Sequence, residues 1–284
     1  MTDTSTPLNV ETVLNYYDDP GDGTEPTPVV IGQGTVTNER KMAQVPVTVH
    51  DMTGREDTFT LNTHGFQLVR NRPTEATACL ADGFHDVGLI KSDYFDDCVS
   101  LLKQETGASR VFVFDHKVRR GPADWHSLGK GNASQRGPLH RVHVDQSYDG
   151  AAFLVKWYLP DEAEALLRKH WQIINAWRPI NTVYKDPLAV ADARSVADSD
   201  LVEARVIYRD HERRTWTVKA SPTHQWHYKH AQTPDEVMLI KCFDSIGDGS
   251  VARRVPHSAF YDAQYDYAPP RESIEIRALI FYDV

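Results

Sequence analysis

The sequence predicts a mainly β fold with flanking helices that closes as a barrel, and three observations lead to this prediction. Strand-like apolar runs crowd the second half of the chain. Two segments with helical features precede most of these runs. Six Trp, twelve Tyr and ten Phe supply flat, rigid side chains that suit strands and the walls of small-molecule pockets. Many short strands after helices are typical of a barrel.

The length of 284 residues, with 40% hydrophobic content, favours a single domain over residues 1–284. Pro and Gly punctuate the first 30 residues and the stretch 121–137, so we expect loops in both places and treat 1–30 as an N-terminal extension. Between them, residues 41–49 and 58–61 alternate apolar and polar side chains across a turn signal. That alternation predicts a β-hairpin.

Two helices are predicted next. Residues 86–105 carry apolar side chains at spacings of three and four, which line one face of a helix: Ile90, Tyr94, Cys98, Leu101 and Leu102. A second, short helix begins at Pro160, a favoured first-turn residue, and continues through acidic residues into Leu166 and Leu167.

The rest of the chain has the composition of strands. The predicted strands are residues 172–176, 205–208, 215–219, 237–243 and 273–282. Thr233 and Glu236 have the spacing of a capping box, but the residues that follow are strand-like. We therefore expect a turn that leads into a strand at this point.

Composition restricts the partners. A formal charge of -9 and the lack of a long basic run argue against nucleic acid. Cys79, Cys98 and Cys242 form no CxxC motif and cannot all pair, which fits a reducing compartment. Residues 1–28 lack an apolar signal region and no run approaches 18 apolar residues, so we expect a cytoplasmic protein without a membrane anchor.

One pair of residues has the spacing of metal ligands. In Arg141-Val142-His143-Val144-Asp145 the side chains of a strand alternate, so His143 and Asp145 point to the same side. This is the only His-x-Asp/Glu motif in the chain, and by itself it is also what a polar strand pair looks like. A facial triad needs a second histidine from elsewhere, and it leaves coordination positions open for an oxo acid and dioxygen. His257 is the candidate.

A carboxylate clamp follows at a suitable distance. Arg271, 14 positions after His257, begins the only Arg-x-Ser of the chain, and Ser273 completes it. A guanidinium and a hydroxyl on one face of a strand can hold the distal carboxylate of 2-oxoglutarate. Arg277 is a rival because it shares that face, and Arg178 is a further candidate for the oxo acid or an acidic substrate, although an ordinary salt bridge explains it equally well.

Other histidines have simpler explanations. His224, His227 and His230 lie three apart, which is a spacing found in zinc sites, but on a strand such neighbours face opposite sides. His140 points away from His143 for the same reason, and we expect it to be solvated. Beyond the three proposed metal ligands, the sequence indicates no separate catalytic residue.

The order of His-x-Asp, distal His and Arg-x-Ser resembles the non-haem iron(II)/2-oxoglutarate dioxygenase superfamily. More narrowly, the amino-acid sequence of several segments, which together span nearly the whole chain, resembles that of the CmcJ/AsaB hydroxylase/desaturase family. These segments are residues 15–17, 61–69, 142–147, 175–180, 187–190, 233–245 and 269–277.

The resemblance implies a double-stranded β-helix, the jelly-roll barrel, with its main core in residues 140–284 and iron at its open mouth. It implies Fe(II) as cofactor, 2-oxoglutarate and O2 as cosubstrates, and hydroxylation, desaturation or oxidative ring closure of a small specialised metabolite. A homodimer is compatible with it. Two other functions stay open: a catalytically silent barrel that binds a small molecule, and a cupin-like metalloenzyme that uses no oxo acid.

Overall fold

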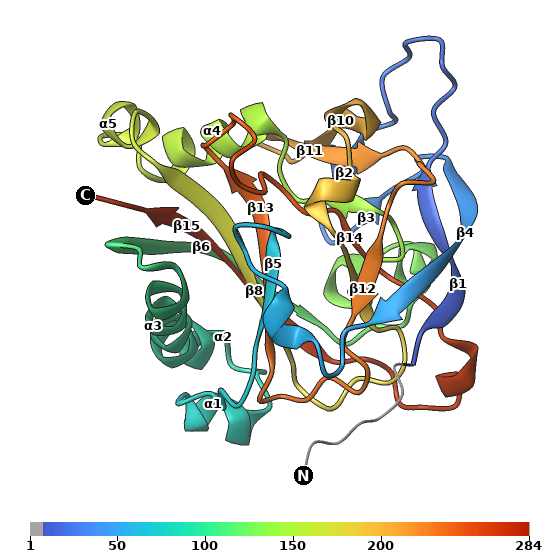
Figure 1. Ribbon diagram of the computed structural model, residues 1–284, viewed down its shortest axis with the longest axis horizontal. Coiled ribbons are helices and arrows are strands. Elements are labelled where there is room, and N and C mark those ends of the chain that lie inside the picture. Colours follow the sequence, from blue (N-terminus) through green and yellow to red (C-terminus); the bar gives the residue numbers. More distant parts are fainter. Residues whose placement is uncertain (1–7, 284) are drawn as a thin grey trace.

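The computed structural model describes residues 8–283, whose strands form two facing sheets (Figure 1). In spatial order the larger sheet contains β1 (Val10–Tyr17), β4 (Met42–Asp51), β12 (Trp226–Tyr228), β9 (Leu188–Ala191), β14 (His257–Ala259), β7 (His143–Val144), β11 (Glu212–Val218), β10 (Leu201–Ile207), β2 (Val29–Ile31) and β3 (Val36–Thr37). The smaller sheet contains β5 (Phe66–Val69), β13 (Val237–Asp244), β8 (Trp171–Pro179), β15 (Ser273–Phe281) and β6 (Arg110–Arg119).

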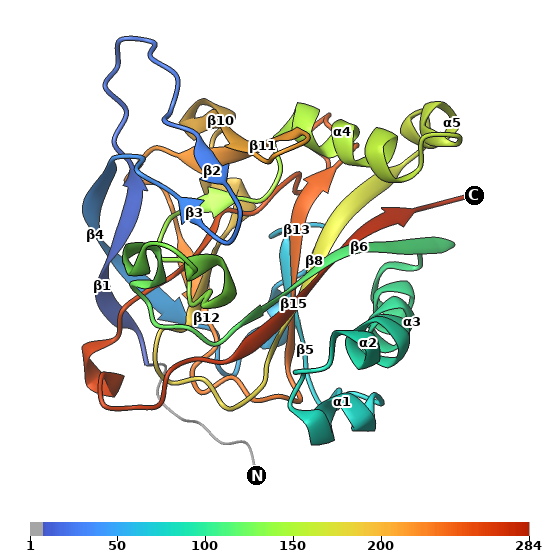
Figure 2. The same cartoon turned by 180° about the vertical axis from the view of Figure 1, so that it is seen from behind.

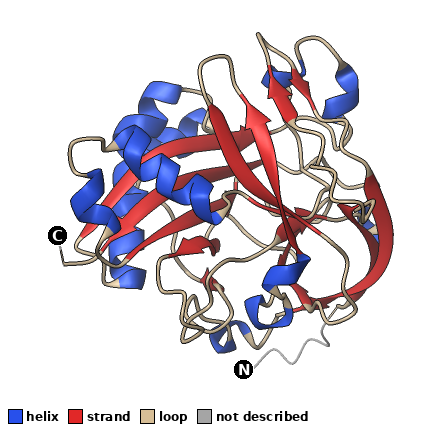
Figure 3. Ribbon diagram, turned by 90° about the horizontal axis from the view of Figure 1, so that it is seen from above, coloured by secondary structure: helices blue, strands red, loops and turns tan. Residues whose placement is uncertain are grey.

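Helices cover the smaller sheet. The helices α1 (Thr77–Asp82), α2 (Val87–Leu89) and α3 (Phe95–Thr106) lie along its outer face (Figures 1 and 2). The helices α4 (Tyr148–Tyr158) and α5 (Ala163–Leu167) lie at one end of the two sheets. Seen from above, most helical ribbon gathers on the side of the smaller sheet (Figure 3).

The strand β15 shows how the two apolar layers form. Its side chains alternate, so that Ile274 and Ile276 pack with the helical layer, whereas Leu279 and Phe281 pack between the sheets. All four are buried. Because two facing sheets enclose one layer and helices cover the other, the predicted mainly β fold with flanking helices, a jelly-roll barrel, is confirmed.

The long helix is also confirmed. Helical turns run without a break from Val87 to Thr106 through a π-helical stretch at Ile90–Tyr94, which the periodicity did not predict. The side chain of Asp86 caps the start by accepting hydrogen bonds from the backbone N–H groups of Gly88 and Leu89 at 2.6 and 3.2 Å. The residues predicted to line its buried face are all buried. The second predicted helix is present as α5 but begins at Ala163, after a turn at residues 160–162.

Each predicted C-terminal strand corresponds to an observed one, namely β8, β10, β11, β13 and β15. The turn before β13 is confirmed as well, since the Glu236 carboxylate accepts a hydrogen bond from the backbone N–H of Thr233 at 2.8 Å. The stretch 121–137 is a loop apart from two short 3-10 turns at Trp125–Leu128 and Asn132–Ser134.

The predicted hairpin is wrong. The strand β4 forms where expected, but it pairs antiparallel with β1, and residues 58–61 form a 3-10 turn and loop instead of a strand. Alternation shows that a segment suits a sheet edge or face, yet it does not identify the partner strand. The expectation of a loop over residues 1–30 is also wrong where β1 and β2 form. The strand β6 and the helices α1 and α4 were not predicted.

Among residues 8–283, no helix combines the length and apolarity that crossing a membrane requires. The three cysteines are buried and unpaired.

Candidate metal centre

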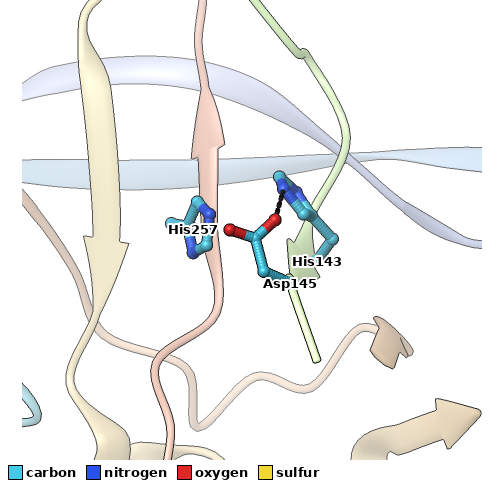
Figure 4. A group of neighbouring side chains, drawn as sticks. All are labelled: His143, Asp145 and His257. Atoms are coloured by element: carbon cyan, nitrogen blue, oxygen red, sulfur yellow. Dashed lines mark ion pairs between the residues drawn. The ribbon is translucent and has the colours of Figure 1, made fainter. Parts of the chain in front are cut away.

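The antiparallel pairing of β7 with β14 brings the candidate ligands together. His143 lies directly opposite His257 in the register of these strands, and their rings are 4.4 Å apart between centroids. Asp145 follows β7 on the same side as His143, with its Oδ1 3.5 Å from His143 Nε2. One ligand atom from each residue lies within 4.8 Å of the others, and Figure 4 shows the three side chains pointing toward one another.

Backbone carbonyl groups orient both imidazoles. His143 Nδ1 lies 2.8 Å from the carbonyl oxygen of Arg141, and His257 Nδ1 lies 3.1 Å from that of Val255. A carbonyl only accepts, so each Nδ1 carries the proton and each Nε2 keeps a lone pair for a metal. Burial and the neighbouring His143 lower the pKa of His257 to about 4, which keeps this ring neutral.

Two side chains of the smaller sheet bind the carboxylate of Asp145. Asn175 of β8 donates to Asp145 Oδ2 at 2.6 Å, and Arg277 of β15 donates to Oδ1 at 3.2 Å. Burial alone would raise the pKa of the Asp145 carboxyl, but the charge of Arg277 and the nearby imidazoles keep it well below its usual range. Two imidazoles and one ionised carboxylate form the donor set of a facial triad, which suits iron(II).

Arg277 is fully engaged by acidic groups. Besides Asp145, its Nε donates to Glu275 Oε1 at 2.8 Å, and its Nη1 lies 3.8 Å from Asp115 Oδ2. A guanidinium surrounded by three carboxylates has little capacity left for a fourth. Its place in the fold therefore fits the support of Asp145 better than the clamping of an oxo acid.

Arg271 and Ser273, in contrast, have free hydrogen-bonding groups. Arg271 is 5% exposed and donates from Nη1 to the Asp186 carbonyl at 2.7 Å, but its Nε finds no partner among residues 8–283, and neither does the buried Ser273 Oγ. Burial and the nearby Arg119 lower the pKa of Arg271 to about 9. Within residues 8–283 this buried guanidinium forms no ion pair and this buried hydroxyl has no partner, which is unfavourable unless an anion binds there.

Arg178 lies on the wrong face for this role. Its side chain contacts the helical layer, where Nε donates to the hydroxyl of Tyr94 at 3.1 Å and Nη1 donates to the backbone carbonyls of Arg72 and Pro234. Alternation along β8 sends Arg178 outward and Trp177 inward. The sequence hypothesis that Arg178 contacts the oxo acid is therefore corrected: it ties the sheet to its covering helices.

The other histidines lie apart from the triad. His224 lies between Tyr16 and Asp200, at 3.0 and 3.1 Å, while His227 packs against Phe59, 4.8 Å between ring centroids. His140 is half-buried with Nε2 3.0 Å from the carboxylate of Asp186, so the expectation of a solvated side chain is wrong.

Sequence reasoning assigned no role to three residues around the centre. Asn175 binds Asp145, and Trp177 lies under the Arg271 guanidinium at 5.4 Å. Arg119 pairs in register with Ser273, so their side chains share a face, and it donates to the Gly137 carbonyl at 3.0 Å. Alternation along β8 places Asn175 and Trp177 on one face but does not tell which face turns inward, and Arg119 was missed because β6 was not predicted.

A cavity of about 1030 Å³, including its open mouth, adjoins the triad, and His143 and Asp145 form part of its wall. A concave site beside a metal centre is where a small-molecule substrate would bind. The arrangement thus combines three converging metal ligands, a buried guanidinium and hydroxyl with free donors, and a cavity beside the triad.

Comparisons with known proteins agree with this chemistry. The family model of an oxidoreductase/YMDC permease-like domain matches residues 14–281. The hydroxylase/desaturase efuI of Hormonema carpetanum is 39% identical, covering 96% of this chain and 95% of the relative. The hydroxylase/desaturase asaB of Aspergillus flavus is 32% identical, with 96% and 95% covered. The solved structure of the iron and alpha-ketoglutarate-dependent endoperoxidase NvfI is similar with a TM-score of 0.83 and 28% identity, covering 98% of both chains.

Proposed function

The chain belongs to the hydroxylase/desaturase family of iron(II)/2-oxoglutarate-dependent dioxygenases, and from this premise we propose that it oxidises a C–H bond of a small specialised metabolite. Hydroxylation, desaturation and oxidative ring closure all begin at such a bond. The observation that carries the proposal is the convergence of His143, Asp145 and His257 beside a cavity.

In this proposal the three triad residues hold iron(II). When bound, iron(II) with 2-oxoglutarate and O2 supplies the oxidising power, and the oxo acid is converted to succinate and CO2. The protein contributes the orientation of the ligands. The carbonyls of Arg141 and Val255 fix the imidazole rings, while Asn175 and Arg277 fix the carboxylate.

Arg271 and Ser273 bind the distal carboxylate of 2-oxoglutarate in this proposal. Support comes from the unpartnered Nε and Oγ atoms and from the pKa of Arg271, which burial without a carboxylate partner lowers. A fork of N–H donors can hold a carboxylate through two parallel hydrogen bonds. The alternatives fit less well, since a silent binding barrel would need neither triad nor clamp, and a cupin-like enzyme without an oxo acid would not need Arg271 and Ser273.

We further propose that the chain works as one catalytic domain. The imidazoles come from the larger sheet and the groups that hold Asp145 come from the smaller one, so neither sheet forms the site alone. A homodimer and a cytoplasmic location stay predictions from the sequence.

Anaerobic titration tests the function. Adding iron(II) and then 2-oxoglutarate to the metal-free protein should produce a weak visible metal-to-ligand charge-transfer band, which His257→Ala should lose. His224→Ala, which changes a histidine remote from the triad, is the matched control and should keep the band. A band that survives in His257→Ala and disappears in His224→Ala would refute the triad, and no band in the unaltered protein would refute the use of the oxo acid.

A further inference from the structure

The wall of the cavity beside the triad is strongly cationic, although the whole chain carries a formal charge of -9. Seven arginines contribute to it: Arg40, Arg119, Arg136, Arg141, Arg213, Arg214 and Arg277. Among residues 8–283, Asp145 is the only acidic residue of the wall, and Arg277 already binds it. The cavity therefore presents far more positive than negative charge to whatever enters.

Most of these arginines form no ion pair with another described residue. Arg214 pairs with Glu203 at 2.6 Å, and Arg277 pairs with Asp145 and Glu275. Within residues 8–283 the other five arginines, which we call the unpaired arginines, have no carboxylate within ion-pair distance. They are Arg40, Arg119, Arg136, Arg141 and Arg213. Among the described residues, the side-chain hydrogen bonds of these arginines go only to backbone carbonyls, an amide, a hydroxyl or a histidine ring.

The unpaired arginines include groups with free donors. Arg136 is half-buried, its guanidinium makes no hydrogen bond among the described residues, and it lies 5.9 Å from the ring of Trp125. The buried Nη2 of Arg40 and the buried Nε1 of Trp125 also have no partner in residues 8–283. All three groups can donate and none can accept, so an acceptor-rich, negative group is the ligand that would satisfy them.

Three of the unpaired arginines line the same cavity as His126 and act on its charge. Burial and the charges of Arg141, Arg119 and Arg136 lower the pKa of His126, which also lines the cavity, to about 4. Like charges gathered around a neutral ring repel one another and gain from an anion placed among them.

Part of the remaining wall is apolar. Val29, Ile31, Val36, Met42, Leu139 and Leu154 line the same cavity, and they come from β2, β3, β4, α4 and the segment before β7. An apolar body attached to a negative group matches this combination of surfaces.

We propose that the substrate is an apolar small molecule bearing a carboxylate, which Arg136 and Arg141 hold beside His126 while its apolar body faces the triad. Naming this ligand as substrate rests on the proposed function, whereas the preference for an anion can be measured without metal. Arg271 and Ser273 do not line this cavity, so the carboxylate of the substrate and that of 2-oxoglutarate occupy different places.

The test compares 2-naphthoate with 2-naphthamide, which share an apolar body and differ in charge. Binding to the metal-free protein is followed by quenching of tryptophan fluorescence. A charge-assisted contact in a partly buried site should make the acid bind at least about tenfold more tightly than the amide. Arg136→Gln should reduce this preference to about twofold, and Arg136→Lys should restore part of it, because the charge returns without the planar fork.

Arg214→Gln is the matched control, since Arg214 lines the same cavity but is already paired with Glu203 and its side chain is 48% exposed. It should leave the preference unchanged, and circular dichroism verifies that each variant is folded. Equal binding of acid and amide, an unchanged preference in folded Arg136→Gln, or displacement of naphthoate by 2-oxoglutarate would each overturn the proposal. The iron titration described above is unaffected by any of these results, so the two proposals fail separately.

Discussion

Removing the guanidinium of Arg271 tests the oxo acid clamp most directly. In Arg271→Ala a buried carboxylate loses a partner with two parallel donors, and stripping one charged partner from such a pair costs about 2–5 kcal/mol. With about 1.4 kcal/mol for each factor of ten, the apparent dissociation constant of 2-oxoglutarate should rise roughly 30- to several-thousand-fold. The hydroxyl of Ser273 remains in this variant, so weakened binding is expected instead of complete loss.

Two neighbouring variants calibrate this result. Ser273→Ala removes one neutral donor to a charged acceptor, which is worth about 1.5 kcal/mol, and should weaken 2-oxoglutarate about tenfold. Arg277→Ala should leave the constant within about a few fold, because its guanidinium already faces Asp145, Glu275 and Asp115. The expected order of damage is therefore Arg271, then Ser273, then Arg277.

Two measurements read out the order. The first is the dependence of succinate formation on 2-oxoglutarate concentration. The second needs no turnover: a ligand that binds only the folded state raises the unfolding temperature by an amount set by its concentration relative to Kd, and Arg271→Ala should lose most of that rise. If Arg277→Ala proved the costly change for 2-oxoglutarate while Arg271→Ala was mild, the clamp would move to Arg277.

Three further predictions follow from the site and its surroundings. Alanine at His143, Asp145 or His257 should abolish turnover, because each change removes one of three metal ligands; normal succinate formation by any of these variants would contradict the triad. Asn175→Ala should weaken iron(II) binding about 10- to 100-fold in equilibrium dialysis and leave the fold intact, since it frees one oxygen of Asp145; unchanged iron affinity would rule out that role. Burial and the charge of His50 lower the pKa of His227 from 6.5 to about 4, so the unfolded chain binds an extra proton between these values. The stabilisation from the neutral ring is complete above about pH 6.5 and is lost as the pH falls toward 4, and His227→Phe should flatten urea midpoints over this window; an unaltered pH profile would refute it.

The elements that sequence predicted well are those whose own periodicity decides them. The face of the helix from Val87 to Thr106 and the strand β15 both follow from the spacing of apolar residues. Pairing is a different matter, because β4 joins β1 across a long loop and the sequence offers no local turn that fixes this register. The hairpin prediction failed there, as alternation carries information on a face and none on a neighbour.

The residues of the site also separate into those that the sequence could predict and those that it could not. His143 and Asp145 lie on one short strand, so their shared direction could be predicted, and the unique Arg-x-Ser pointed to Arg271. The direction of the Arg178 side chain could not be predicted. The strand β8 is buried on both faces, so it shows no polar side from which the direction of its side chains could be read. Arg119 depends on β6, whose mixed apolar and charged residues are all partly buried and give no clear pattern.

The placement of charge explains why this site is built between two sheets. Each imidazole is fixed by a carbonyl of its own segment, so the larger sheet alone could present two nitrogen ligands. Asp145 would then be free to rotate, and its burial would favour the protonated form. The contacts from Asn175 and Arg277 hold it ionised and oriented, and both come from the opposite sheet. The third metal ligand is therefore completed only when the sheets pack against each other, which ties the integrity of the metal centre to the apolar layer between them.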